Sequence, residues 1–345
     1  MINGARRGVI SSPQLFSIIF ISRAVVSFTY IQAVSVGKFS SDVLISYAMS
    51  YFLSLLLSVP ALMCVKKGVS PLDNKLLSLL YAVYYLLVCV QSVTRFSYFA
   101  VSKLNPKISF AAIVLIIFVA VGYGAYLGLE PLARFASFCA VVLGLVIVTV
   151  LLSNIDNFDV LNFYPIFVNS RKNIFSNALL FTANSAQPIT LLALYKRTNS
   201  RPVTAYCLGL SASYASVMLL LVFCCGVLGA NADLQAFPIF TLFRMASFSD
   251  VSRLDILHTS FWIFAVYLKC AVMIYCAGLC VKGTNRLKET SALTAAAAAL
   301  SVLLIALVGM DISSFFVKIG AVMYVVFVVL VPLVVSLKKG EKKNA

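Results

Sequence analysis

The stretch Phe181-Thr-Ala-Asn-Ser-Ala-Gln-Pro188 lies at the centre of the apolar segment 174–195 and contains four polar residues and a proline. A helix inside a membrane must satisfy its backbone hydrogen bonds internally, and a proline nitrogen donates none. The stretch therefore predicts a broken helix, whose freed amides and carbonyls can bind a small ligand as they do in many secondary transporters. The alternative is a proline kink packed by small residues.

The composition is that of a polytopic membrane protein. Of the 345 residues, 62% are hydrophobic and 11% are charged, whereas a soluble globular chain has about 45–50% apolar and about 25% charged residues. The nine cysteines fall within or at the edges of apolar stretches. They are therefore expected to be buried small side chains and to form neither disulfides nor a zinc site.

Ten apolar runs are long enough to span a bilayer, and we expect one all-α membrane domain over residues 1–345. A long connection, 154–173, divides the runs into a first repeat of about 13–153 and a second of about 174–337. Because five spans is an odd number, the two repeats must be inverted relative to each other in the membrane. The runs lie near residues 13–35, 41–65, 76–101, 109–129, 131–153, 174–195, 203–229, 254–280, 290–310 and 313–337.

Basic residues are distributed unequally between alternate connections. With a cytoplasmic N-terminus, sixteen Lys and Arg residues lie on the cytoplasmic side and eight on the outer side. This asymmetry follows the positive-inside rule and predicts that both termini are cytoplasmic, with connections 154–173 and 230–253 outside. The excess of basic residues therefore reports topology, and no nucleic-acid partner is needed to explain it.

Three basic residues lie inside the predicted spans, namely Arg23, Arg95 and Lys269, and no Asp or Glu lies at a comparable depth. A charge at mid-span costs about 2.5–3.5 kcal/mol on insertion scales, so Arg23 and Lys269 should face the protein interior. They could form an electropositive site for an anionic group such as a carboxylate, or bind helix carbonyls that a break exposes. Arg95 lies closer to the outer interface, where it could also snorkel.

The polar residues of these spans predict a ligand pocket at the membrane midplane. Span one has a polar stretch comparable to that of span six, although it lacks the glycine pair that usually permits unwinding. With one histidine, no paired membrane carboxylates, no glycine-rich phosphate loop and no metal-ligand spacing, the sequence predicts neither an enzyme, a metal site nor a cofactor. The predicted pocket residues are Ser22, Arg23, Ser27, Tyr98, Thr182, Asn184, Ser185, Gln187 and Lys269, although Tyr98 could equally be a packing residue.

Two motifs carry a resemblance to a known family. Gly128-Leu-Glu130-Pro-Leu-Ala-Arg134 resembles the Gly-Leu-Glu-x-x-Ala-Arg signature of bacterial spore germination permeases, the B subunits of nutrient germinant receptors. The stretch Phe237-Pro-Ile-Phe-Thr-Leu-Phe-Arg244, continued by Arg253-Leu-Asp255, Trp262 and Lys269, is similar to a second block of that family. With ten spans, the resemblance covers the whole chain.

The resemblance implies an amino acid–polyamine–organocation type fold, a 5+5 inverted repeat with broken helices 1 and 6. It also implies an A subunit and a lipoprotein C subunit as partners in the inner membrane of the spore. By position, Glu130 and Arg134 would form a structural pair on the cytoplasmic side, and Arg244, Arg253 and Asp255 would order the outer loop. In sodium-dependent members of the fold a cation lies between helices 1 and 8, and Lys269 could replace it through contacts with carbonyls of span one.

Two functions remain open at this point. The chain could be the nutrient-sensing subunit of a germinant receptor, or it could be a secondary transporter of amino acids or amines. Both functions use the same pocket, and a sensor can be a transporter that does not complete its cycle.

Overall fold

The structure, a computed structural model, describes residues 8–34, 36–246, 254–281, 286–308 and 312–341. These residues are nearly all helical, and the two-residue strands β1 (Ile10–Ser11) and β2 (Thr198–Asn199) pair in parallel. The helices are α1 (Ser12–Val34), α2 (Asp42–Lys66), η1 (Pro71–Asp73), α3 (Lys75–Phe99), η2 (Ala100–Leu104), α4 (Phe110–Leu127), α5 (Leu129–Ser153), η3 (Val160–Phe163), α6 (Arg171–Ala183), α7 (Gln187–Leu194), η4 (Tyr195–Arg197), α8 (Pro202–Leu228), η5 (Gly229–Leu234), α9 (Pro238–Met245), α10 (Asp255–Val281), α11 (Arg286–Val308), α12 (Ile312–Tyr324), η7 (Val325–Leu330) and α13 (Val331–Glu341).

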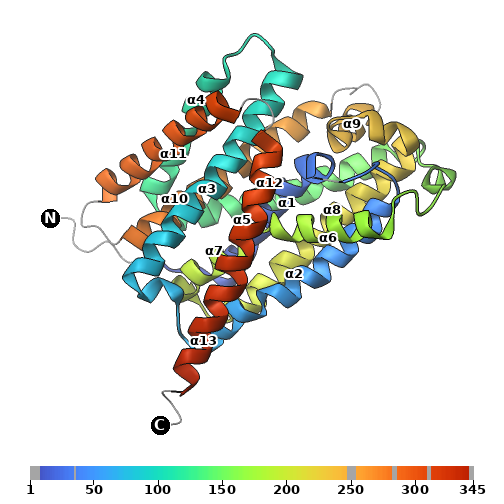
Figure 1. Ribbon diagram of the computed structural model, residues 1–345. Coiled ribbons are helices and arrows are strands. Elements are labelled where there is room, and N and C mark those ends of the chain that lie inside the picture. The colour runs from blue at the N-terminus through green and yellow to red at the C-terminus, as the bar shows by residue number, and fades with distance from the viewer. Residues whose placement is uncertain (1–7, 35, 247–253, 282–285, 309–311, 342–345) are drawn as a thin grey trace.

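Eight helices among the described residues are long and apolar enough to cross a membrane, as expected of a multi-pass membrane protein. The predicted spans 13–35 and 174–195 correspond to α1 and to the α6–α7 pair, which are outside that set. In Figure 1, α4 and α11 lie on one flank of the bundle, α2, α6 and α8 lie on the opposite flank, and α12 continues into α13 across the front. The eight spans are Asp42–Lys66, Lys75–Leu104, Phe110–Leu127, Leu129–Ser153, Pro202–Leu234, Asp255–Val281, Leu287–Leu307 and Ile319–Lys338.

The predicted break in span six is confirmed, and the predicted break in span one is wrong. Helix α6 ends at Ala183 and α7 begins at Gln187. Helix α1, in contrast, runs without interruption from Ser12 to Val34. Its only proline is in the first turn, where a missing N–H is tolerated, and it contains no glycine. Polar side chains alone therefore do not unwind it.

A single residue separates α4 from α5. Gly128 has φ +108° and ψ −176°, a conformation that side-chain-bearing residues rarely adopt. This confirms that the turn between spans four and five is tight. Helix α5 begins at Leu129, two residues before Pro131, which lies in the first turn.

At one end of the bundle, three connections meet around buried Asp42, and we call this the Asp42 end. The Asp42 carboxylate accepts hydrogen bonds from the backbone N–H groups of Phe167 and Asn169, both at 2.8 Å, and from the Asn169 side chain at 3.2 Å. Asp233, in the connection after α8, accepts a hydrogen bond from the Phe39 N–H at 2.7 Å and so holds that connection at the same end. These bonds fix the α5–α6 connection against the start of α2.

We expect Asp42→Asn to lower the free energy of unfolding by about 1–2 kcal/mol, because the amide replaces one acceptor oxygen with a donor and leaves a buried N–H unsatisfied. Limited proteolysis within residues 155–168 should also become faster. The matched control is Asp156→Asn, an exposed position in the same connection, which should leave both properties unchanged. Equal cleavage rates in the two variants would contradict the role given to Asp42.

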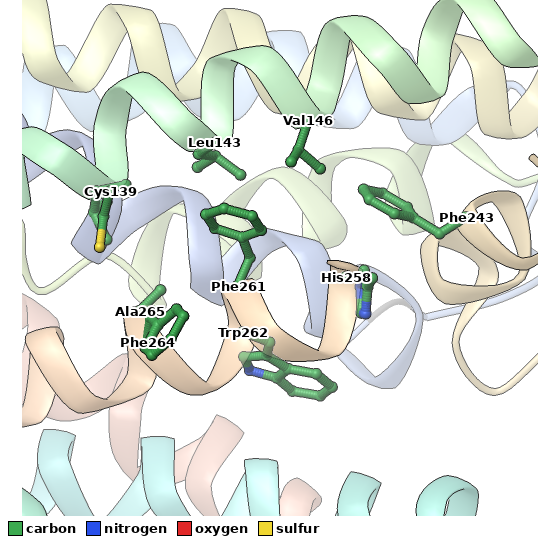
Figure 2. A pocket seen from close by; sticks show the side chains of 10 residues that line it. Cys139, Leu143, Val146, Phe243, His258, Phe261, Trp262, Phe264 and Ala265 are labelled. Carbon is green, nitrogen blue, oxygen red and sulfur yellow. The ribbon is translucent and has the colours of Figure 1, made fainter. Parts of the chain in front are cut away.

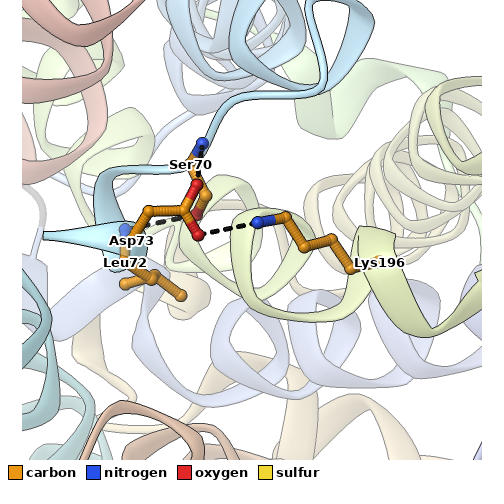
Figure 3. Close-up of polar contacts among 4 residues, drawn as sticks. All are labelled: Ser70, Leu72, Asp73 and Lys196. Carbon is orange, nitrogen blue, oxygen red and sulfur yellow. Dashed lines mark hydrogen bonds and ion pairs between the residues drawn. The ribbon is translucent and has the colours of Figure 1, made fainter.

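The opposite end, which we call the Asp73 end, joins the start of the chain to the end of α7. Asp73 accepts a hydrogen bond from the Ser70 N–H and forms an ion pair with Lys196 at 2.7 Å (Figure 3). Partial burial works to lower the pKa of Lys196, but its contacts with Asp73 and Tyr195 outweigh this effect and raise the pKa overall. The β1–β2 pairing and a hydrogen bond from Ser12 to the Asn199 carbonyl lie beside it.

Candidate functional site

The break between α6 and α7 frees backbone groups inside the bundle. Pro188 lies in the first turn of α7 and donates no backbone hydrogen bond. The Ser185 N–H bonds the Thr182 carbonyl at 3.0 Å instead of continuing the α-helical pattern to Phe181. The Phe181 carbonyl is thereby available to side chains from other helices.

Arg23 of α1 binds this freed carbonyl. Its side chain is buried, and its Nη2 donates to the Phe181 carbonyl at 3.2 Å and to the Tyr214 hydroxyl at 2.6 Å. The guanidinium carbon also lies 4.5 Å from the centre of the Tyr214 ring, a cation–π contact. The positive charge of Arg23 interacts favourably with the negative end of the α6 dipole. Arg23 therefore makes the tie to exposed helix carbonyls that was one of its two predicted roles.

Tyr214 of α8 connects Arg23 to a row of serines on α2. The Tyr214 hydroxyl lies 2.6 Å from the Ser54 hydroxyl and 3.2 Å from the Ser50 carbonyl. That carbonyl also accepts a hydrogen bond from Thr182 at 3.2 Å. Ser46 and Ser58 are buried in the same row. A spacing of four residues places side chains on one helix face, so this row has a signal in the sequence, although the predicted pocket did not include it.

Helix α3 holds both sides of the break. The Asn184 side-chain oxygen accepts hydrogen bonds from Arg95 at 3.2 Å and from Gln91 at 3.4 Å. The Tyr85 hydroxyl donates to the Ile189 carbonyl of α7 at 2.7 Å. Arg95 is buried and points to the break, so it does not snorkel to the interface.

Lys269 is buried on α10, which packs against α1, α3, α4 and α5. It makes no hydrogen bond or ion pair with any residue that the structure describes. The expected contacts with carbonyls of span one are not observed among these residues. Because α1 is continuous, its carbonyls are engaged within the helix.

Several further side-chain polar atoms are buried in the described part of the chain without a hydrogen-bond partner, and three of them matter for the site. They are the hydroxyl of Ser22, the side-chain nitrogen of Gln187 and the hydroxyl of Tyr324. The Gln187 oxygen already accepts from Ser185 at 2.6 Å. Buried polar groups normally have partners, so these three require an explanation. Tyr324 was not among the predicted pocket residues. It lies at the end of α12, and its burial depends on how that helix packs, so no local sequence pattern indicates it.

The remaining predicted residues lie elsewhere. Tyr98 is 37% exposed and packs against Phe237, with ring centres 6.4 Å apart. The side chain of Ser27 lies outside the described residues. Among the predicted structural residues, Glu130 and Arg134 form an exposed ion pair at 2.6 Å, Arg244 is exposed at the end of α9, Asp255 begins α10 half-buried, and Arg253 lies outside the described residues.

A small cavity of about 20 Å³ lies away from the break, between α5, α9 and α10 (Figure 2). Its lining is apolar apart from His258, whose ring centre lies 4.9 Å from that of Phe243 and 5.8 Å from that of Trp262. This volume holds about one water molecule. The cavity is therefore too small for a nutrient.

A buried polar helix break within a bundle of apolar helices is a feature of many secondary transporters. The family model for spore germination proteins matches residues 9–315, and the chain belongs to this family. No curated protein sequence matches the chain.

Two solved structures have a similar fold. A sodium-coupled sialic acid symporter in a substrate-bound, outward-open state is 12% identical, with a TM-score of 0.64, over 93% of this chain and 78% of the symporter. A nucleobase-cation-symport-1 family transporter in a closed conformation is 13% identical, with a TM-score of 0.51, over 91% of this chain and 75% of that transporter. The chain thus shares the fold of these two transporters.

Proposed function

We propose that the chain is the B subunit of a nutrient germinant receptor and that it binds an amino acid or a related small molecule at the break between α6 and α7. The observation that carries this proposal is the electropositive interior beside the break. Arg23 and Lys269 are buried there, whereas the one buried carboxylate in the described part of the chain, that of Asp42, lies at an end of the bundle. A ligand carboxylate would complement these charges.

The packing of the helices supports one membrane domain of ten spans with two inverted repeats. If spans one to five correspond to spans six to ten, contacts should occur in matched pairs. Helix α1 packs on α8 as α6 packs on α2, α4 packs on α10 as α11 packs on α3, and α4 packs on α5 as α11 packs on α12. The proposed symmetry between the two repeats converts the first contact of each pair into the second.

Opposite ends of the bundle would lie on opposite sides of the inner membrane of the spore, with the Asp73 end and both termini in the cytoplasm. We expect an impermeant thiol reagent added from outside to modify cysteines introduced at Leu161 and Leu234, which are 72% and 80% exposed. A cysteine at the exposed position Lys75, near the Asp73 end, serves as the control and should not react. The native cysteines are buried or half-buried, which keeps the background low. Labelling of Lys75→Cys alone would reverse the orientation.

The proposed assembly includes an A subunit and a lipoprotein C subunit. This part of the proposal follows from membership in the family. Pull-down of the tagged chain from spore membranes should recover both subunits in comparable amounts. Recovery of the chain alone from intact complexes would argue against the receptor.

We expect Asn184→Ala to shift the nutrient concentration that gives a half-maximal germination response by about tenfold, because the break loses the acceptor that orients Arg95 and Gln91. Membrane insertion and protein level should not change. Asn157→Ala, an exposed position near the Asp42 end, is the matched control and should respond like the wild type. A wild-type response from Asn184→Ala, and from a matching Thr182→Val variant, would place the pocket elsewhere.

The second candidate is a secondary transporter of amino acids or amines. The solved structures with this fold favour it, since one is a sodium-coupled symporter and the other belongs to a nucleobase-cation symport family. Purified protein in liposomes distinguishes the two functions. Accumulation of a labelled nutrient would identify a transporter, whereas saturable binding without accumulation is expected of the sensor.

A further inference from the structure

The groups left without partners around the helix break are mainly hydrogen-bond donors. The Gln187 side-chain nitrogen and the buried Lys269 ammonium can only donate, and the hydroxyls of Ser22 and Tyr324 can donate or accept. The Gln187 oxygen, the acceptor of that side chain, is already bonded to Ser185. A ligand that satisfies this set must therefore be rich in acceptor atoms.

These donors come from helices that meet at one place. Helices α7, α10 and α12, which carry Gln187, Lys269 and Tyr324, each pack against α1, which carries Ser22. Arg23, the neighbour of Ser22 on α1, reaches the Phe181 carbonyl at the end of α6, so this part of α1 lies beside the break. A single small ligand can therefore contact donors from several helices.

The charge of this region has the same sign throughout. The Arg23 side chain donates to a carbonyl and to a phenol, both neutral, and Lys269 is buried on α10, which packs against α1 and α3, the helices of Arg23 and Arg95. Gln187 is the first residue of α7, where the helix dipole adds a partial positive charge. An ammonium on the ligand would add a positive charge to a region that already contains the buried cations Arg23, Arg95 and Lys269, whereas the buried carboxylate among the described residues, that of Asp42, lies at an end of the bundle. Burial of like charges without compensation is strongly unfavourable.

We propose that the ligand of this site is a small organic acid with a net negative charge, a carboxylate that carries no ammonium group. This inference rests on the proposed function and narrows it, because it excludes neutral amino acids and amines as the preferred ligands. The carboxylate accepts hydrogen bonds from Lys269 and Gln187, and the remaining hydroxyls bind its polar substituents.

Two pairs of probes isolate charge from size. L-lactate and L-alanine differ in having a hydroxyl or an ammonium on the same three-carbon carboxylate, and succinate and putrescine are four-carbon chains with opposite terminal charges. Binding can be followed in the full-length protein in detergent by thermal stabilisation and by fluorescence of Trp262, the sole tryptophan, which lies two turns from Lys269 on α10. We expect lactate to bind at least about tenfold more tightly than alanine, the size expected for one charged hydrogen bond. Succinate should bind more tightly than putrescine.

Two variants test the named donors. Lys269→Met removes the charge and should weaken lactate binding by about tenfold or more while changing alanine binding little. Gln187→Glu adds a carboxylate of nearly the same shape, and its charge at the first residue of α7 is favoured by the positive end of the helix dipole, which should keep the protein folded. This variant should lose lactate binding and gain binding of alanine or putrescine. Lys38→Met removes an exposed charge near the Asp42 end and is the matched control, with wild-type selectivity expected.

The outcomes separate this inference from the proposed function. Tighter binding of alanine than of lactate in the wild type would overturn the assigned ligand charge and would leave a nutrient site in place. Unchanged selectivity in Gln187→Glu would remove these donors from the site. If all four probes fail to bind while germination still depends on Asn184, the ligand is not a small carboxylate and the proposed function survives. If germination does not depend on Asn184 or Thr182 either, both proposals fail.

Discussion

Arg23→Met is expected to lower the free energy of unfolding in detergent by about 3 kcal/mol, because it removes two hydrogen bonds from a buried cation and leaves the Phe181 carbonyl and the Tyr214 hydroxyl with less compensation. The cation–π contact with Tyr214 is lost as well. Methionine keeps much of the side-chain length, so the loss in free energy of unfolding should come mainly from the lost polar contacts and little from a new cavity. The measurement is thermal unfolding monitored by size-exclusion chromatography.

The control for this prediction is Arg134→Met. Arg134 and Glu130 form an ion pair whose side chains are 73% and 51% exposed, and exposed pairs contribute about 0–1 kcal/mol. Equal losses of stability in the two variants would mean that the tie between α1 and the end of α6 is energetically unimportant.

Lys269→Met is expected to abolish the nutrient response while leaving stability equal to or above that of the wild type. The ammonium is buried and has no hydrogen-bond partner among the described residues, and burying such a charge costs several kcal/mol. Removal of the charge relieves this cost, but it also removes the group proposed to bind the ligand. Stability measured by thermal unfolding and germination measured in spores should therefore change independently.

Because Lys269 already provides a buried positive charge on α10, which packs against α1, function is expected to be independent of sodium. The wild type should respond equally in sodium and in potassium. A response that collapses when sodium is replaced, or a fully responsive Lys269→Met protein, would remove the basis for this role. A destabilised and inactive variant would show that Lys269 has partners beyond those described.

Local sequence signals predicted the elements that backbone chemistry controls. The break in span six follows from Pro188 and its polar neighbours, and the tight turn at Gly128 follows from a glycine between two apolar runs. The break in span one was predicted from polar side chains, and it fails because no residue between Gln14 and Val34 prevents backbone hydrogen bonding. Conformational preference of the backbone is thus a better guide to helix ends than side-chain polarity inside a membrane.

The candidate site was predicted only in part, because its contacts join distant segments. Arg23, Lys269 and the residues of the break were found from charge and polarity within apolar runs. Tyr214 and Tyr324 have no such signal, since a tyrosine in a membrane span more often lies at an interface. Their roles depend on which helix faces meet, and the sequence of one helix does not specify this. For Tyr98 the sequence left a pocket role and a packing role open, and its side chain packs beside Phe237.

The two halves of span six are tethered by different helices. Arg23 and the Ser50 carbonyl bind the end of α6, whereas Tyr85 binds the start of α7, and three residues connect the two. A ligand that enters between them adds contacts to both halves at once, so that a shift of one half relative to the other changes the distance between α1 and α3. The break is thereby a joint between two separately anchored half-helices, at which a small displacement of one half can move whole helices at both ends of the bundle.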